Sequence, residues 1–147
     1  LQTSPLQTVP KGHGKRRVVL DLSSPRVNDG IPKDSFLDEP LFLSLPRSSD
    51  FADLIIAKGS GCFLFKKDLK REYRQIRVDP RDHNLLGYTW SDLQYFDLVL
   101  SFGLHSATLA CQQTTNTIAH IFYPVYHHQC VNYIDDFGSV EASTTLL

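Results

Sequence analysis

The sequence has no Lys or Arg beyond residue 81, only three cysteines, and no long hydrophobic run. An odd number of cysteines without a signal peptide argues against a disulfide framework, so we expect an intracellular protein of the cytoplasm or nucleus that is not secreted. No apolar run reaches the roughly 18–20 residues needed to span a bilayer, which excludes a membrane partner. The chain does not begin with Met and ends without a Gly or Pro stop signal, so we expect part of a longer protein.

The charges that are present are unevenly distributed. Residues 1–81 hold all 15 Lys and Arg with 10 Asp and Glu, whereas residues 82–147 hold 6 Asp and Glu and no basic residue. The first part, with a balance of +5, can bind polyanions, and the second, with a balance of −6, repels them unless cations intervene. The asymmetry of charge suggests that the protein uses a metal. The content of 41% hydrophobic residues is enough for a core and predicts a globular protein.

Local patterns predict a mixture of helices and strands. A strand is expected over residues 17–22, mostly loop over 23–46, and a helix over 50–58 with an N-cap in Ser48-Ser49-Asp50 and a C-cap at Gly59. The apolar run at residues 62–65 predicts a buried strand that ends at Asp68.

The second half of the chain continues this alternation. Residues 85–90 and 95–100 predict a hairpin around Ser91-Asp92, and residues 106–122 predict a helix that ends before Pro124. Strand character returns over residues 131–140, around a tight turn at Asp135-Asp136.

Three aspartates are the candidate metal ligands. Asp135 and Asp136 are adjacent in an otherwise apolar hairpin, where two like charges repel unless a cation compensates them. Asp68 ends a separate strand, and Mg²⁺ is commonly held by one or two carboxylates together with waters and substrate phosphates. Two such ions can serve phosphoryl transfer. The alternative for the Asp135-Asp136 pair is a solvated turn, because aspartates are common in turns.

Four motifs in order resemble those of reverse transcriptases, and most closely those of retrotransposons of the DIRS or related kind. The resemblance covers about residues 9–140. The matching segments are Val9 to Ser23, similar to a fingers hairpin; Phe65 to Ile76, similar to the first palm motif; Leu100-Ser101-Phe102-Gly103-Leu104, similar to the second motif; and Tyr133-Ile134-Asp135-Asp136, similar to the aspartate box.

The resemblance implies a role for each candidate site residue. Asp68, Asp135 and Asp136 would be the catalytic, metal-binding carboxylates. They would bind two Mg²⁺ ions, for which Mn²⁺ could substitute. The implied nucleotide-binding residues are Lys11 and Arg17 for the triphosphate, Tyr73 as the steric gate against a ribose 2′-OH, and Phe102 and Gly103 beside the incoming nucleotide. From composition alone, the alternatives are a solvated basic edge around Arg17, a packed aromatic at Tyr73, and a simple helix start at Gly103.

The implied fold is α+β, an antiparallel polymerase palm sheet backed by helices with partial fingers. Residues of about 1–60 would be fingers-like and about 61–147 palm-like, with the thumb and RNase H domains absent. The implied partners are an RNA or DNA template with its primer and deoxynucleoside triphosphates, and a basic cluster that includes Lys66, Lys67 and Lys70 could follow a nucleic-acid backbone. Two alternatives to a polymerase stay open: a catalytically inactive nucleic-acid-binding remnant of a decayed element, and a two-metal nuclease.

Overall fold

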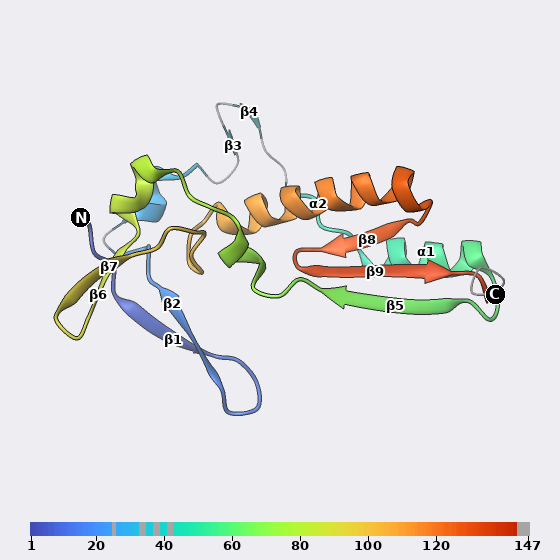
Figure 1. The fold of residues 1–147 in the computed structure, drawn as a ribbon, viewed down its shortest axis with the longest axis horizontal. Coiled ribbons are helices and arrows are strands. Elements are labelled where there is room, and N and C mark those ends of the chain that lie inside the picture. Colours follow the sequence, from blue (N-terminus) through green and yellow to red (C-terminus); the bar gives the residue numbers. More distant parts are fainter. Residues whose placement is uncertain (25, 33–34, 37–38, 41–42, 144–147) are drawn as a thin grey trace. The chain divides into compact units, whose positions relative to one another are not determined.

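The computed structural model describes residues 1–24, 26–32, 35–36, 39–40 and 43–143 (Figure 1). The chain forms two compact units, each assembled from two separate segments. Unit 1 consists of Leu1–Phe42 and Arg71–Ala107, and unit 2 of Leu43–Lys70 and Thr108–Leu147. Helices and antiparallel strands occur together, and the fold is α+β, as the sequence predicts.

Unit 1 is built from antiparallel hairpins and short 3₁₀ helices. Its paired strands are β1 (Leu6–Pro10) with β2 (Arg16–Leu20), β3 (Ser35–Phe36) with β4 (Glu39–Pro40), and β6 (Gly87–Trp90) with β7 (Leu93–Phe96). The 3₁₀ helices span Val27–Gly30, Glu72–Gln75 and Pro80–Leu85. The strand predicted at residues 17–22 is therefore confirmed but begins and ends earlier.

The β6–β7 hairpin turns where the sequence predicts. Ser91 and Asp92 have φ values of 49° and 62°, the left-handed pair of a two-residue turn whose twist matches that of the flanking strands. The segment 23–46, predicted as mostly loop, contains a 3₁₀ helix and the two short strands β3 and β4, and its residues 25, 33–34, 37–38 and 41–42 lie outside the described part.

A small apolar core holds unit 1 together. Leu20, Leu22 and Leu86 are each at most 3% exposed, and partly buried hydrophobic side chains pack around them. The buried Asn28 closes the adjoining loop, because its amide donates to the Gly103 carbonyl at 2.8 Å and accepts from the His105 backbone N–H at 3.0 Å. A buried side-chain amide that both donates and accepts a hydrogen bond fixes the backbone groups that it binds.

Unit 2 is a three-stranded antiparallel sheet with two helices against it. The sheet order is β5 (Phe63–Asp68), β9 (Asp136–Glu141) and β8 (Cys130–Tyr133), and the helices are α1 (Ser48–Lys58) and α2 (Ala107–Tyr126). The ring of Phe51 on α1 packs so closely on Gly138 that a Cβ there would lie 2.8 Å from it. This contact places α1 over the central strand β9, and β5 and β8 form the two edges of the sheet.

Three details of unit 2 correct the sequence-based predictions. Helix α1 begins at Ser48, so the predicted capping residues lie in its first turn, where the Asp50 carboxylate accepts from the Arg47 backbone N–H at 2.7 Å. Helix α2 continues past Pro124 to Tyr126, although the proline removes one intrahelical hydrogen bond. The helix closes with a bond from the His127 N–H to the Tyr123 carbonyl, with His127 at a φ of 57°.

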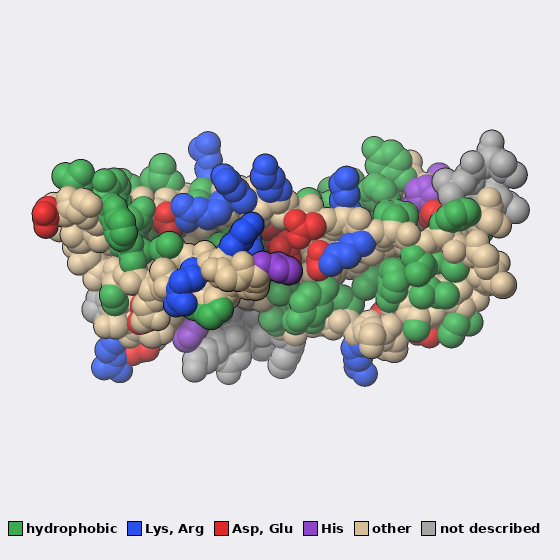
Figure 2. Space-filling model, turned by 90° about the horizontal axis from the view of Figure 1, so that it is seen from below, with side chains coloured by type: hydrophobic (Ala, Val, Ile, Leu, Met, Phe, Trp, Pro, Cys, Tyr) green, Lys and Arg blue, Asp and Glu red, His purple; other side chains and the backbone are tan. Residues whose placement is uncertain are grey.

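The third correction concerns β5, which the sequence predicts to be buried. Phe63, Leu64 and Phe65 are 51%, 56% and 43% exposed, because an edge strand is covered less than the central strand. Hydrophobic side chains reach the surface in several patches in Figure 2. Within the described part of the chain, no helix has the length and apolar character that crossing a bilayer requires.

Candidate functional site

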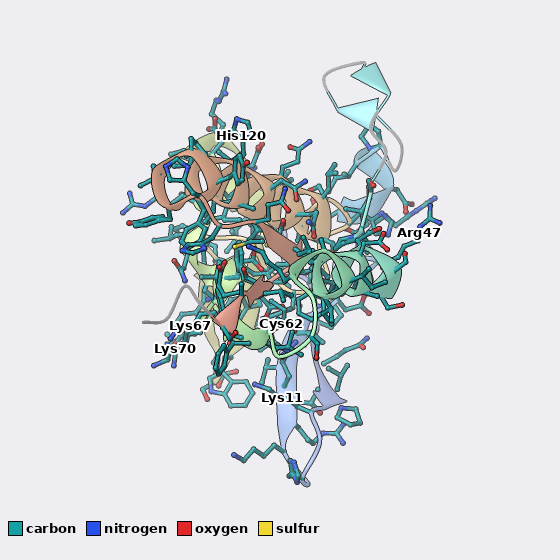
Figure 3. The ribbon with its side chains drawn as sticks, turned by 90° about the vertical axis from the view of Figure 1, so that its right-hand side faces the viewer. Lys11, Arg47, Cys62, Lys67, Lys70 and His120 are labelled. Atoms are coloured by element: carbon teal, nitrogen blue, oxygen red, sulfur yellow. The ribbon has the colours of Figure 1, made fainter. Side chains whose placement is uncertain are left out.

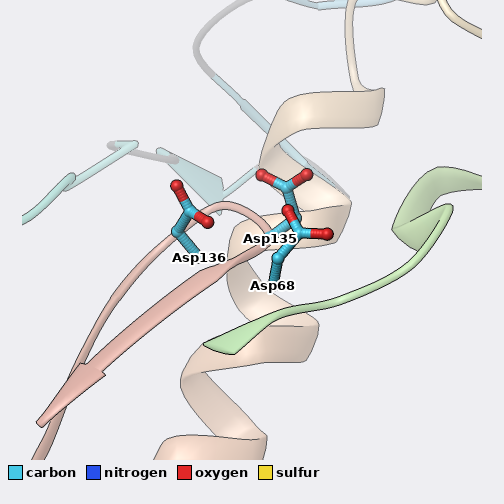
Figure 4. A group of neighbouring side chains, drawn as sticks. All are labelled: Asp68, Asp135 and Asp136. Carbon is cyan, nitrogen blue, oxygen red and sulfur yellow. The ribbon is translucent and has the colours of Figure 1, made fainter. Parts of the chain in front are cut away.

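The three candidate metal ligands come together in unit 2. Asp68 is the last residue of β5, Asp136 is the first residue of β9 and its direct cross-strand partner, and Asp135 lies in the turn that precedes β9. Each carboxylate offers one oxygen, and these oxygens all lie within 4.8 Å of one another (Figure 4). The sequence motifs thus identify residues that the sheet register brings to one point.

The backbone fixes this arrangement from two sides. The N–H of Leu69, directly after Asp68, donates to the Asp135 carbonyl at 2.8 Å and ties the end of β5 to the turn. Asp68 is exposed and the other two carboxylates are half-buried. A cluster that is open to solvent and offers only oxygen atoms suits a hard cation such as Mg²⁺, which retains water ligands.

Lys66 forms an ion pair with one carboxylate of this cluster. Its ammonium lies 2.7 Å from Asp136, and both side chains extend from neighbouring strands. The hydrogen bond to Asp136 raises the pKa of Lys66, and the charges of Asp68 and Asp135 raise it further. The acidic cluster therefore attracts positive charge in the folded protein, and one carboxylate already has a partner.

Three of the candidate nucleotide-binding residues meet in unit 1. The Arg17 guanidinium stands over the Phe102 ring at 4.4 Å from its centroid, a cation–π contact. The Tyr73 ring packs on the same Phe102, with 4.8 Å between ring centroids. Tyr73 is half-buried, so the structure fits both of its interpretations, as a packed aromatic and as a ring at the wall of a site.

Phe102 also lines a cavity of about 590 Å³ in unit 1. The walls combine apolar side chains of the β1–β2 hairpin with Tyr88, two arginines and an aspartate; the lining residues are Leu6, Val18, Val19, Leu20, Arg71, Arg74, Tyr88, Asp97, Ser101 and Phe102. Arg74 donates two parallel hydrogen bonds to Asp97, at 2.7 and 2.9 Å, which raises the pKa of the Arg74 guanidinium. A cavity with apolar walls and a few placed charges is typical of a small-molecule site.

The remaining two candidates occupy different settings. Lys11 lies on the β1–β2 hairpin, where its N–H donates to the Lys15 carbonyl at the hairpin end (Figure 3). Gly103, at a φ of +107°, is required by packing, because a Cβ there would lie 2.2 Å from the Leu20 carbonyl oxygen. Lys67 and Lys70, near the end of β5, also carry exposed ammonium groups (Figure 3).

Sequence reasoning missed two groups of polar residues near these sites. One is the Arg74–Asp97 pair, and the other is a buried set on α2 and β8 that includes Gln112 and Asn132. The signal for the second was present, since Gln112 and Thr115 fall at helical spacing on the same face as the apolar Cys111. Polar residues on a buried helix face need partners, and a neighbouring turn supplies them.

Comparison with known proteins gives structural matches only. No protein-family model and no curated protein sequence matches the chain. Among solved structures, the foamy viral protease-reverse transcriptase dRH in complex with double-stranded DNA superposes with a TM-score of 0.68 at 18% identity, covering 99% of this chain and 23% of that one.

The chain has a reverse transcriptase-like fold. Native Prototype Foamy Virus protease-reverse transcriptase agrees, with a TM-score of 0.64, 20% identity, and coverage of 98% of this chain and 17% of that one. A second complex of the foamy viral enzyme with double-stranded DNA has a TM-score of 0.65 and 19% identity, and the match covers 98% of this chain and 27% of that one. The chain therefore spans about a quarter or less of the length of these enzymes.

Proposed function

We propose that this chain is the fingers-to-palm part of a polymerase that adds deoxynucleotides to a primer on an RNA or DNA template. The observation that carries the proposal is the meeting of Asp68, Asp135 and Asp136 within 4.8 Å on an antiparallel sheet. The reverse transcriptase-like fold supports it, and the motif residues favour a retrotransposon of the DIRS or related kind as the source. The proposed division is fingers-like to about residue 60 and palm-like beyond it.

The proposal assigns divalent metal binding to the three carboxylates. Asp68 and Asp135 together would hold two Mg²⁺ ions through their oxygens, and Asp136 would assist once a bound ion replaced Lys66 as its partner. The bound ions would lower the pKa of the primer hydroxyl and neutralise charge on the transferred phosphate. The donor set fits this task, because it consists of oxygen atoms alone and remains open to water and phosphate.

Nucleotide contacts are assigned to unit 1. Arg17 and Lys11 would donate to triphosphate oxygens, the guanidinium in a fork and the ammonium as a point charge. Tyr73, held against Phe102, would stand beside the sugar, and the Phe102-Gly103 backbone beside the base.

In a form of the protein that extends primers, we expect Tyr73→Ala to raise ribonucleotide incorporation while deoxynucleotide use partly survives. Unchanged sugar selectivity would reassign Tyr73 to packing.

Nucleic acid is the proposed macromolecular partner. The foamy viral enzyme is bound to double-stranded DNA in two of the matching structures, and by analogy this chain would bind a primed template. Lys67 and Lys70 are exposed, and we assign them to contacts with backbone phosphates. Binding through such contacts should weaken as salt rises, because it releases condensed counterions.

Metal binding is the first test. Mn²⁺ titration followed by electron paramagnetic resonance should show saturable binding to the protein, strongly reduced in Asp68→Asn and Asp135→Asn. Asp53→Asn, which removes an exposed carboxylate on α1, is the matched control and should bind as the wild type does. Equal binding by Asp135→Asn and the wild type would refute the metal site.

Primer extension is the second test. With Mg²⁺, deoxynucleotides and a primed RNA template, we expect this chain alone to bind in a salt-sensitive way and to synthesise little DNA, because polymerisation also needs a firmly held primer end. Robust extension that Asp135→Asn abolishes would show that the chain is sufficient. Salt-sensitive binding together with a failed metal titration would favour the inactive nucleic-acid-binding remnant.

A further inference from the structure

The turn that carries Asp135 has an unusual backbone conformation. Ile134, directly before Asp135, has a φ of +53°, in the left-handed region that β-branched residues rarely adopt. Such a conformation persists only where surrounding contacts enforce it. The question is which contacts hold Ile134 in place.

Gln112 of α2 supplies those contacts. Its side-chain oxygen accepts from the Ile134 backbone N–H at 2.7 Å, and its amide nitrogen donates to the Asn132 carbonyl at 3.0 Å. The two bonds reach both neighbours of Tyr133, so a single side chain clamps the end of β8. The amide orientation is unambiguous, because exchanging its oxygen and nitrogen would set two donors against each other at Ile134.

The Gln112 side chain is itself held by a polar network whose members are buried except for Asn116. Gln112 is 2% exposed, and its nitrogen also donates to the Asn116 side-chain oxygen at 2.8 Å. The Asn132 amide donates to that same oxygen at 2.8 Å and to the Thr115 hydroxyl at 3.1 Å. With its partners fixed in this way, Gln112 has little freedom to release the turn.

The clamp acts on the geometry of the carboxylates. On one side of Asp135 its own carbonyl is tied to Leu69, and on the other side Ile134 is tied to Gln112. These two attachments determine where the backbone directs the Asp135 carboxylate, which Figure 4 shows beside that of Asp68. Groups behind metal ligands commonly set ligand orientation, and their loss typically weakens metal binding by about 10- to 100-fold.

We propose that Gln112 is a positioning residue for the metal site, acting by locking Ile134 in its left-handed conformation so that Asp135 faces Asp68. This inference rests on the proposed function, since it presumes that the carboxylates bind a divalent cation. It adds a residue on α2 that touches neither metal nor substrate.

The test replaces Gln112 by Met, which keeps the length and the helix propensity but removes every hydrogen bond. Mn²⁺ titration should show binding weakened by about 10-fold or more. Gln113→Leu, a polar-to-apolar change at the exposed neighbouring position of α2, is the control and should bind as the wild type does. Gln112→Met with wild-type affinity would overturn the proposal.

A rescue variant separates positioning from folding. Glycine adopts a positive φ without strain, so Gln112→Met combined with Ile134→Gly should recover Mn²⁺ affinity to within about threefold of the wild type. This double variant also decides the matter if the single variant does not fold, as judged by circular dichroism. A double variant that folds but binds as weakly as expected for the single one, or that does not fold, would overturn the proposal.

The outcomes also distinguish this inference from the proposed function. If the wild type binds no Mn²⁺, or binds it equally well with Asp135→Asn, the metal site itself fails and the inference falls with it. If Asp135→Asn abolishes binding and Gln112→Met leaves it unchanged, the metal site stands and only the role of Gln112 is refuted.

Discussion

Replacing Asp135 by Asn should stabilise the metal-free protein while removing its response to metal. Two unit charges 4.8 Å apart repel by about 0.9 kcal/mol in water and by about 3.5 kcal/mol at an effective dielectric constant of 20. Because the cluster is open to solvent, the lower figure applies to each pair. Asp135 faces two other carboxylates, and losing its attraction to Lys66 offsets part of the gain, so we expect a net stabilisation of about 1 kcal/mol.

Thermal unfolding by circular dichroism measures this effect. In EDTA, Asp135→Asn should unfold about 3–5 °C above the wild type, given the usual relation between stability and Tm for a domain of this size. With Mn²⁺ at about 100 times its Kd, binding adds about 2.7 kcal/mol to the wild type, so the order of the two proteins should reverse.

The control for this prediction is Asp53→Asn. It should change neither the Tm in EDTA nor the stabilisation by Mn²⁺ appreciably, because Asp53 lies outside the cluster. An Asp135→Asn protein that is no more stable than the wild type in EDTA would refute the repulsion argument. Equal stabilisation of both proteins by Mn²⁺ would refute the assignment of Asp135 as a metal ligand.

Three further predictions concern single residues. Gly103→Ala should cost about 3 kcal/mol in urea unfolding, because its Cβ would meet the Leu20 carbonyl at 2.2 Å and φ is +107°. Lys66→Gln should tighten Mn²⁺ binding by roughly two- to fivefold, since it frees a carboxylate of an exposed ion pair. Hydrogen bonding from the Arg81 side chain and backbone lowers the pKa of Asp79 from 3.8 to about 2, and in Arg81→Gln an NMR titration should find this pKa raised toward 3.8 but still below it, because the backbone N–H of residue 81 still donates.

Each of these predictions has an internal check. Gly12→Ala, at a φ of +56° but with open space around it, should cost only about 1 kcal/mol, and a loss equal to that of Gly103→Ala would contradict the clash. Lys67→Gln should leave Mn²⁺ affinity unchanged, because successive strand side chains point to opposite faces. Since the folded pKa of Asp79 is depressed, its stabilising contribution is complete above pH 3.8 and is lost as pH falls toward 2.

The elements that carry the carboxylates could be predicted from local patterns, and the resemblance of the motifs implied that the carboxylates meet. Asp68 ends the strand that begins with an apolar run, and Asp135-Asp136 interrupts a second apolar segment; the pairing of β5 with β9 brings the three together. The exposure of β5 could not be predicted in the same way. An apolar run indicates a strand, but whether it lies at the centre or the edge depends on the sheet order, which only the tertiary contacts determine.

The contacts around Phe102 show a second limit. The sequence motifs indicate Arg17, Tyr73 and Phe102 separately, and nothing in their spacing predicts that the first two pack on the third. The Arg74–Asp97 pair likewise joins residues 23 positions apart. Pairings of this kind arise from how separate hairpins pack, whereas turn signals such as Ser91-Asp92 act within a few residues and were predicted correctly.

The cross-strand position of Asp68 opposite Asp136 gives the proposed metal site a possible effect on the sheet itself. Asp68 closes an edge strand, which has neighbours on one side only, whereas Asp136 opens the central strand of the sheet. A cation shared by the two would connect the edge to the centre at the end of the ladder, where strands separate most readily. Occupancy of the site would therefore affect how tightly the end of β5 is attached to β9. The local order of this edge would then depend on the bound ion.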